Sequence, residues 1–129
     1  MTTHNLLSRD PADCHLLLVD DHADTLLAVG KYLRQCGYVV HTAATFAQAL
    51  EIALAHPIHV LVTDIGLPDG DGCDLLTEIR ASRPIRGLAI SGYGMSEDIE
   101  RCTQAGFEKH LLKPIKPDDL RSAIENACS

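Results

Sequence analysis

Hydrophobic and polar positions follow two different rhythms along this chain. Five short runs rich in Leu, Ile and Val predict strands. Three of these runs are nearly continuous in apolar residues, which is typical of strands buried on both faces of a parallel sheet. The runs cover residues 15–20, 38–42, 58–63, 87–91 and 108–112.

Longer amphipathic segments lie between and after these runs, and each one predicts a helix. Residues 23–36 carry apolar positions at helical spacing and are followed by Gly37, a natural helix stop. Thr45 and Gln48 have the spacing of a capping box. The other helices are predicted over residues 45–56, around 75–79 with an end before Pro84, from Ser96 to Gly106, and from Pro117 to Cys128.

Strict alternation of strands and helices predicts a doubly wound α/β fold. Parallel neighbours need helical crossovers, so five strands and five helices form an open parallel sheet with helices on both faces. The commonest order for five strands is the flavodoxin-like 2-1-3-4-5, with ligands bound beyond the carboxyl ends of the strands. We expect residues 1–13 to form a flexible N-terminal tail and residues 14–129 to form the domain.

Composition narrows the classes of function. The chain of 129 residues is 46% hydrophobic with a mean hydropathy of +0.03, which is typical of a globular protein. Neither a signal peptide nor a membrane-spanning run is evident, so we expect a cytoplasmic location. The net charge of −7 disfavours direct contact with nucleic acid, and we expect no membrane partner.

Cysteine and histidine positions suggest no further site. The five cysteines are odd in number and far apart, so we expect reduced thiols and no zinc or redox centre. His56 and His59 flank Pro57 between a predicted helix and a predicted strand. We expect them to occupy ordinary loop and strand positions rather than to bind a metal.

Charged and polar residues follow the ends of four predicted strands. Asp20 and Asp21 follow the first, Asp64 follows the third, Ser91 ends the fourth and Lys113 follows the fifth. In the expected order these ends meet at one edge of the sheet, where a hard divalent cation such as Mg²⁺ would relieve the repulsion between the carboxylates. An ammonium and a hydroxyl beside that cation suit a phosphoryl group, with Asp64 as its acceptor.

These residues resemble a known family, the receiver domains of two-component response regulators. The resemblance rests on "DD" at 20–21, "TDIGLPDGDG" at 63–72, "ISG" at 90–92 and "LKP" at 112–114. It implies that Asp20, Asp21, Asp64 and the backbone carbonyl of Gly66 hold Mg²⁺. It also implies that Asp64 accepts phosphate from a kinase phosphohistidine, that Ser91 and Lys113 contact the phosphoryl oxygens, and that the peptide bond before Pro114 is cis.

The resemblance also implies a switch and partners. Ser91 would move toward the phosphate, but the family's strand-five aromatic is replaced by His110, whose rotation we offer as a hypothesis. The expected partners are a histidine kinase or histidine phosphotransfer protein and a downstream protein on the fourth helix, fifth strand and fifth helix. We expect a monomer or weak dimer. Tyr93 and Gly66 occupy positions that influence dephosphorylation in the family, although a plain loop role fits equally well.

Segment 89–114 is similar to the receivers of hybrid sensor kinases, so the chain is either a stand-alone regulator without an output domain or one domain of such a kinase. Two alternatives stay open. A small phosphohydrolase with an Asp nucleophile would carry an acid–base residue where Gly66 stands. A degenerate receiver would act only as a docking module. Because the acceptor, the acidic pair, the hydroxyl and the lysine are all present, we expect self-catalysed phosphoryl transfer rather than an ordinary enzyme.

Overall fold

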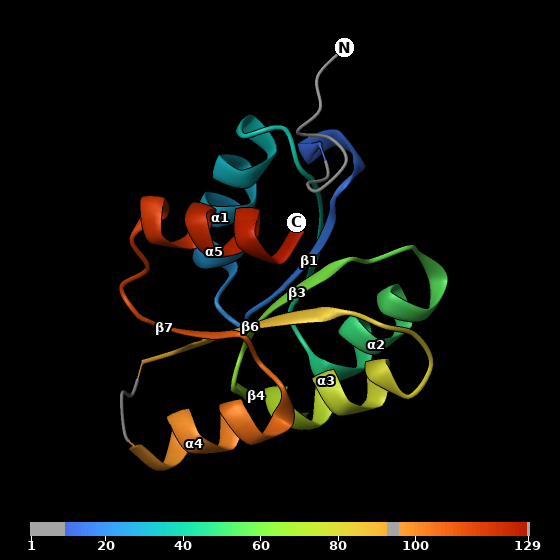
Figure 1. Ribbon diagram of the computed structural model, residues 1–129, viewed down its shortest axis with the longest axis vertical. Helices are drawn as coiled ribbons and strands as arrows, with labels where there is room; N and C mark the ends of the chain where they lie inside the picture. Colours follow the sequence, from blue (N-terminus) through green and yellow to red (C-terminus); the bar gives the residue numbers. More distant parts are fainter. Residues whose placement is uncertain (1–9, 93–95, 129) are drawn as a thin grey trace.

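A single parallel sheet organises the computed structural model, which describes residues 10–92 and 96–128 (Figure 1). Its strands run in the order β2-β1-β3-β6-β7, which is the predicted order 2-1-3-4-5 in terms of chain sequence. The doubly wound fold is therefore confirmed. The five strands are β1 (His15–Val19), β2 (Val39–Ala43), β3 (Val60–Asp64), β6 (Arg86–Ser91) and β7 (Lys109–Leu112).

Five helices cover the two faces of the sheet. They are α1 (Ala23–Gln35), α2 (Phe46–Ala55), α3 (Gly72–Arg80), α4 (Ser96–Ala105) and α5 (Pro117–Cys128). Figure 1 shows α1 and α5 on one side of the sheet and α2, α3 and α4 on the other. Successive residues of β1 face opposite sides, so Leu16 and Leu18 join the first core while Leu17 and Val19 join the second. This explains why the β1 run is apolar throughout.

The predicted helix boundaries follow from local chemistry. The Thr45 hydroxyl accepts a hydrogen bond from the Gln48 backbone N–H at 3.1 Å, and the Gln48 side chain accepts one from Ala44 N–H at 2.9 Å. Gly37 and Gly106 follow α1 and α4 with φ of 100° and 102°, a left-handed conformation that glycine adopts without strain.

Two short elements were not predicted. After β3 the chain forms a small antiparallel hairpin of β4 (Gly66–Leu67) and β5 (Gly70–Asp71). Pro11–Asp13, at the end of the predicted tail, form a 3₁₀ helix that packs beside β2. Both elements are too short to produce a periodic pattern in the sequence.

One expectation about the cysteines is wrong. Cys14, directly before β1, and Cys128, at the end of α5, form a disulfide across 114 residues of sequence, with their Cα atoms 6.4 Å apart. Spacing along the chain could not reveal this pair, because the fold alone brings these two ends together. Cys36, Cys73 and Cys102 keep their thiols. Burial raises the pKa of the Cys73 thiol to about 12, so that thiol is unreactive at neutral pH.

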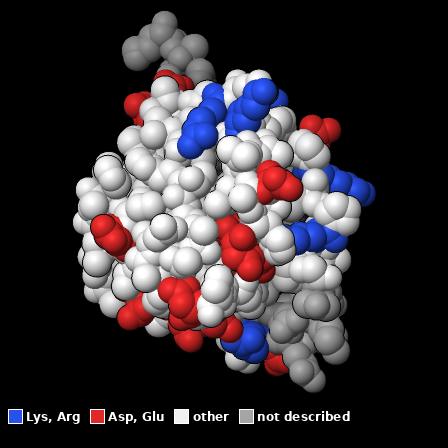
Figure 2. All heavy atoms as spheres, turned by 180° about the vertical axis from the view of Figure 1, so that it is seen from behind, with Lys and Arg blue, Asp and Glu red and all other residues white. Residues whose placement is uncertain are grey.

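The surface agrees with the acidic composition. Figure 2 shows acidic side chains gathered over the lower half of one face, with Lys and Arg mainly along its upper and right-hand edges. Among the helices in the described part of the chain, none has the length and apolar character needed to cross a bilayer.

Candidate functional site

The carboxyl edge of the sheet brings together the residues that the sequence singled out. Asp64 ends the central strand β3 and Ser91 ends the neighbouring β6, while Asp20 and Lys113 directly follow β1 and β7. Asp20, Asp64 and Ser91 are among the few polar residues that are buried. Buried polar groups need partners, and other side chains at this edge supply them.

Lys113 links two of the carboxylates. Its Nζ lies 2.8 Å from Asp64 Oδ2 and 3.0 Å from Asp20 Oδ2. Burial acts to lower the pKa of Lys113, but the pairing with Asp64 and Asp20 outweighs it and holds the pKa above its ordinary value. The ammonium is therefore charged at neutral pH. The peptide bond between Lys113 and Pro114 is cis, the isomer that the resemblance implies.

Asp20 is held from the other side by His22, the residue directly before α1. Its Oδ1 accepts a hydrogen bond from His22 N–H at 2.8 Å, and His22 Nδ1 lies at the same distance. Burial acts to raise the pKa of Asp20, but the hydrogen bonds from His22 and Lys113 outweigh it and keep the pKa below its ordinary value. Asp20 is therefore an anion at neutral pH although it is only 1% exposed.

The carboxylates are close enough to share a cation. Asp20, Asp21, His22 and Asp64 each offer one ligand atom, and these atoms lie within 4.8 Å of one another. Three carboxylates with one ammonium leave two negative charges uncompensated, and oxygen ligands of this kind suit Mg²⁺. The set therefore fits a divalent metal ion. The Asp64 carboxylate also accepts a 3.3 Å hydrogen bond from Gly66 N–H, so Gly66 lies beside it.

Ser91 is joined to the residue that departs from the family pattern. Its hydroxyl lies 2.8 Å from His110 Nε2 on the neighbouring strand β7. His110 is half-buried, so the contact links the inner edge of the site to the outer strand of the sheet. Tyr93 lies outside the described residues.

The loop after Asp64 is held by carboxylates at two helix starts. Asp69 accepts hydrogen bonds from Phe46 N–H (2.7 Å) and Ala47 N–H (3.1 Å) at the start of α2. Asp71 accepts one from Cys73 N–H (2.7 Å) at the start of α3. Since exposed N–H groups at a helix start favour such anions, the two residues hold the β4–β5 hairpin beside the site.

Known proteins resemble this chain in sequence over most of its length. The chain matches the response regulator receiver domain over residues 16–125. The chain belongs to this family. It is 33% identical over 122 residues to the transcriptional regulatory protein GlrR of Escherichia coli K12, which covers 94% of this chain and 27% of GlrR. It is 30% identical over 124 residues to the two-component response regulator ORR3 of Oryza sativa subsp. japonica, which covers 93% of this chain and 92% of ORR3.

A solved structure agrees with this assignment. The CheY-like response regulator receiver domain protein of Methanospirillum hungatei is 30% identical with a TM-score of 0.83, over 88% of this chain and 91% of that one. The receiver domain described here spans only about a quarter of GlrR, as its 27% coverage shows. It is a receiver domain of the kind that two-component systems use.

Sequence reasoning missed one residue of the receiver domain's site. His22 follows the acidic pair directly and precedes the helix predicted from residue 23, and no role is predicted for it from the sequence. The structure instead turns its ring toward the carboxylates, with Nδ1 also 3.2 Å from Asp21 Oδ1. The signal available in the sequence was a metal-ligating residue type adjacent to two acids.

Four other histidines among the described residues lie toward the opposite edge of the sheet, whereas His110 lies beside Ser91. His56 and His59 precede β3 and form a row with two strand residues, His15 and His41, with ring centroids 4.7 to 5.8 Å apart. His59 Nδ1 accepts a hydrogen bond from His15 N–H at 2.9 Å. Within the described residues, this row does not form a group whose nitrogens all lie close enough to share a metal.

Proposed function

We propose that this receiver domain accepts a phosphoryl group on Asp64 from the phosphohistidine of a histidine kinase or histidine phosphotransfer protein. A carboxylate oxygen of Asp64 bonds to phosphorus as the phosphorus–nitrogen bond of the donor breaks, and the histidine nitrogen retains the electron pair. Water later attacks the phosphorus, the bond from phosphorus to the Asp64 oxygen breaks, and inorganic phosphate leaves as the Asp64 carboxylate is restored. The observation that carries the proposal is the convergence of Asp64, Asp20 and Lys113 at one sheet edge, with Nζ–Oδ distances of 2.8 and 3.0 Å.

The surrounding residues have distinct roles in this proposal. Asp20, Asp21, Asp64 and the Gly66 carbonyl would hold Mg²⁺, which when bound neutralises charge on the phosphoryl oxygens. Lys113 is already charged and paired with Asp64. Its ammonium is therefore close enough to contact an oxygen of a phosphoryl group on Asp64. Ser91 supplies a hydroxyl at the end of the next strand.

The contact between Ser91 and His110 supports a switch. If the Ser91 hydroxyl turns toward the phosphoryl group, its 2.8 Å contact with His110 Nε2 breaks. His110 then rotates and changes the surface of β7, which is a population shift between two states. The ¹⁵N resonances of the His110 ring, recorded with and without a phosphate mimic, test this step. Unchanged resonances and an unchanged rotamer would exclude it.

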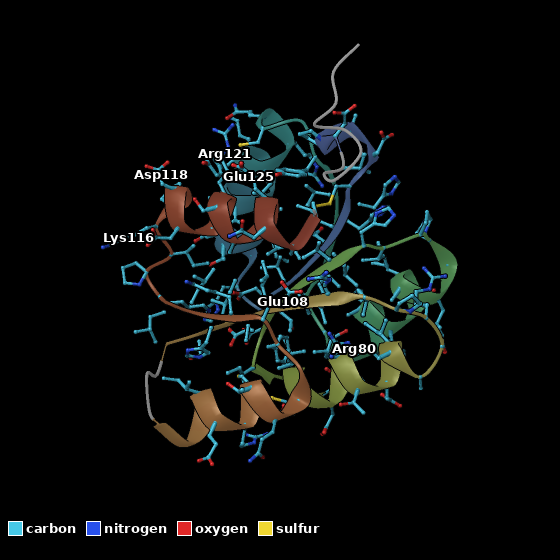
Figure 3. The ribbon with its side chains drawn as sticks, in the orientation of Figure 1. Arg80, Glu108, Lys116, Asp118, Arg121 and Glu125 are labelled. Atoms are coloured by element: carbon cyan, nitrogen blue, oxygen red, sulfur yellow. A yellow bond between two sulfur atoms is a disulfide. The ribbon has the colours of Figure 1, made fainter. Side chains whose placement is uncertain are left out.

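The partner surface in this proposal is formed by α4, β7 and α5. Leu112 on the edge strand β7 is 52% exposed and Ile99 on α4 is 41% exposed, so the surface offers apolar contacts. Exposed apolar side chains of this kind suit contact with a protein partner. Figure 3 shows Arg121 and Glu125, which form an ion pair at 3.3 Å, on the side of α5 that faces α1, so this pair lies outside that surface. Relatives such as ORR3 and GlrR differ in how much of their length a receiver domain fills, so both a stand-alone regulator and a domain of a longer kinase stay within the proposal.

Incubation with acetyl phosphate and Mg²⁺, followed by intact mass measurement, tests the function. We expect a gain of about 80 Da on the native chain, no gain on Asp64→Asn, and an undiminished gain on Asp74→Asn, which alters an exposed aspartate on α3. Steady hydrolysis of a phosphate ester without an adduct would instead identify the phosphohydrolase. An inert chain that still binds its partner would identify the docking module.

A further inference from the structure

Among the described residues, four side chains at the carboxyl edge of the sheet could ligate one metal ion, and His22 is the one among these four that offers a nitrogen. Its side chain is 65% exposed, yet Nδ1 lies 2.8 Å from Asp20 Oδ1 and 3.2 Å from Asp21 Oδ1. An exposed imidazole has many orientations available in water, and this one places its nitrogen against two carboxylates. The backbone of His22 contributes to the same cluster, because its N–H donates to Asp20 Oδ1.

These separations fit neighbouring ligands of one metal ion. Two cis ligands at about 2.1 Å from an octahedral ion lie roughly 3.0 Å apart, and two trans ligands lie about 4.2 Å apart. The distances from Nδ1 to the two carboxylates, 2.8 and 3.2 Å, lie on either side of the cis value. The four ligand atoms also all lie within 4.8 Å of one another. The imidazole nitrogen therefore lies at a position suitable for a ligand of the metal ion.

A nitrogen donor changes the selectivity of an oxygen site. Mg²⁺ is a hard ion that prefers oxygen ligands and retains several waters, whereas first-row transition ions gain more from imidazole. We propose that His22 is an additional ligand of the receiver metal site and makes this site favour a divalent transition ion such as Mn²⁺ over Mg²⁺. The inference rests on the proposed function only in taking the acidic cluster as the metal site.

The test uses Mn²⁺ bound to the unphosphorylated chain. Pulsed electron paramagnetic resonance of bound Mn²⁺ detects the ¹⁴N coupling of a directly coordinated nitrogen. We expect this coupling in the native chain and in His56→Asn, which alters an exposed histidine at the opposite edge of the sheet. We expect no coupling in His22→Asn, a variant that keeps the backbone N–H on Asp20.

Affinities supply a second readout. Calorimetric titration should show that His22→Asn loses about tenfold in Mn²⁺ affinity, while its Mg²⁺ affinity changes much less. Absence of ¹⁴N coupling in the native chain, or equal changes for both ions, would overturn the inference. Tighter binding of both ions by the variant would also overturn it and would identify the ring as an internal counter-ion. Because neither readout uses phosphorylation, an intact adduct on Asp64 together with failure here would leave the proposed function standing.

Discussion

For single residues, the stability of the site depends on direct charge pairs. Asp20 and Asp64 are nearly buried, and each has an oxygen within 3.0 Å of Lys113 Nζ. A buried carboxylate that loses its partner retains its full desolvation cost. The lysine therefore has a structural role as well as the chemical role proposed for it.

Replacement of Lys113 should reveal both roles. We expect Lys113→Met to lower the free energy of unfolding by about 1 to 3 kcal/mol without divalent ions, because it leaves two acids without their ammonium partner. Added Mg²⁺ should restore part of this loss, and the phosphoryl adduct from acetyl phosphate should fall sharply. Urea denaturation with and without Mg²⁺ measures the first effect. Lys109→Met, on the exposed part of β7, is the control, and equal losses in both variants would contradict the prediction.

At the scale of elements, the position of Asp64 depends on how closely α3 approaches β3. A Cβ added at Gly72, the first residue of α3, would lie 2.5 Å from the Asp64 carbonyl oxygen and 3.1 Å from Ile65 Cα. Gly72 N–H also donates to Ile65 carbonyl oxygen at 2.7 Å. Both neighbours are backbone atoms that cannot turn away, so the start of the helix requires glycine.

Gly72→Ala should therefore disturb the fold and the site together. We expect a loss of about 1 to 3 kcal/mol in the free energy of unfolding, since the helix must move away from the strand. We also expect slower formation of the Asp64 adduct. Gly30→Ala within α1 is the contrast, because its Cβ would meet its nearest neighbour at 3.5 Å, an ordinary contact. That variant should be neutral or stabilised by up to about 1 kcal/mol. A Gly72 variant as stable as the Gly30 variant would refute the argument.

At the scale of the whole molecule, one covalent bond joins the two ends of the domain. The Cys14–Cys128 disulfide closes a loop of 114 residues. A crosslink of that span restricts the unfolded chain more than a short one does. Its effect should therefore be seen in global stability rather than in the phosphoryl chemistry at the far edge of the sheet.

Reduction should lower global stability. We expect about 2 to 4 kcal/mol less free energy of unfolding in the presence of a thiol-free reductant, measured by urea denaturation. The double variant Cys14→Ser/Cys128→Ser should show the same value with or without reductant. A native chain whose stability does not respond to reductant would show that the bond does not form in solution.

Acidic pH should also lower the free energy of unfolding, because it protonates His41 in the histidine row. Burial is the main cause that lowers the pKa of His41, and His56, His15 and Arg34 add repulsion. The unfolded chain therefore binds a proton at this residue at a higher pH than the folded chain does. Stability should be full above pH 6.5, the ordinary value for histidine, and should fall as the pH drops below it toward the folded pKa.

Comparison of His41→Gln with the native chain tests this expected decrease of stability at low pH. The free energy of unfolding, measured between pH 8 and pH 5, should fall less steeply in the variant. Thr42→Ser, a substitution without a titrating group on the same strand, should shift the stability equally at every pH. Parallel curves for the native chain and His41→Gln would contradict the assignment.

The order of elements and most of the acidic site can be predicted from the amino-acid sequence. Continuous apolar runs such as 15–19 predict buried parallel strands because both faces need apolar residues, and helical spacing predicts the crossovers. The strand order then places Asp20, Asp64 and Lys113 at one edge, since the carboxyl ends of parallel strands lie together. Local patterns were sufficient here because each depends on residues close in the chain.

Contacts between side chains distant in sequence, and the directions of those side chains, are set by the folded chain. The Cys14–Cys128 pair, the row formed by His41 and its neighbours, and the contact of Ser91 with His110 all join different elements. The orientation of His22 is local in sequence, but it depends on where Asp20 and Asp21 lie after β1 ends. Contacts between side chains of different elements depend on packing and strand register. The periodicity of apolar residues along the chain does not specify either.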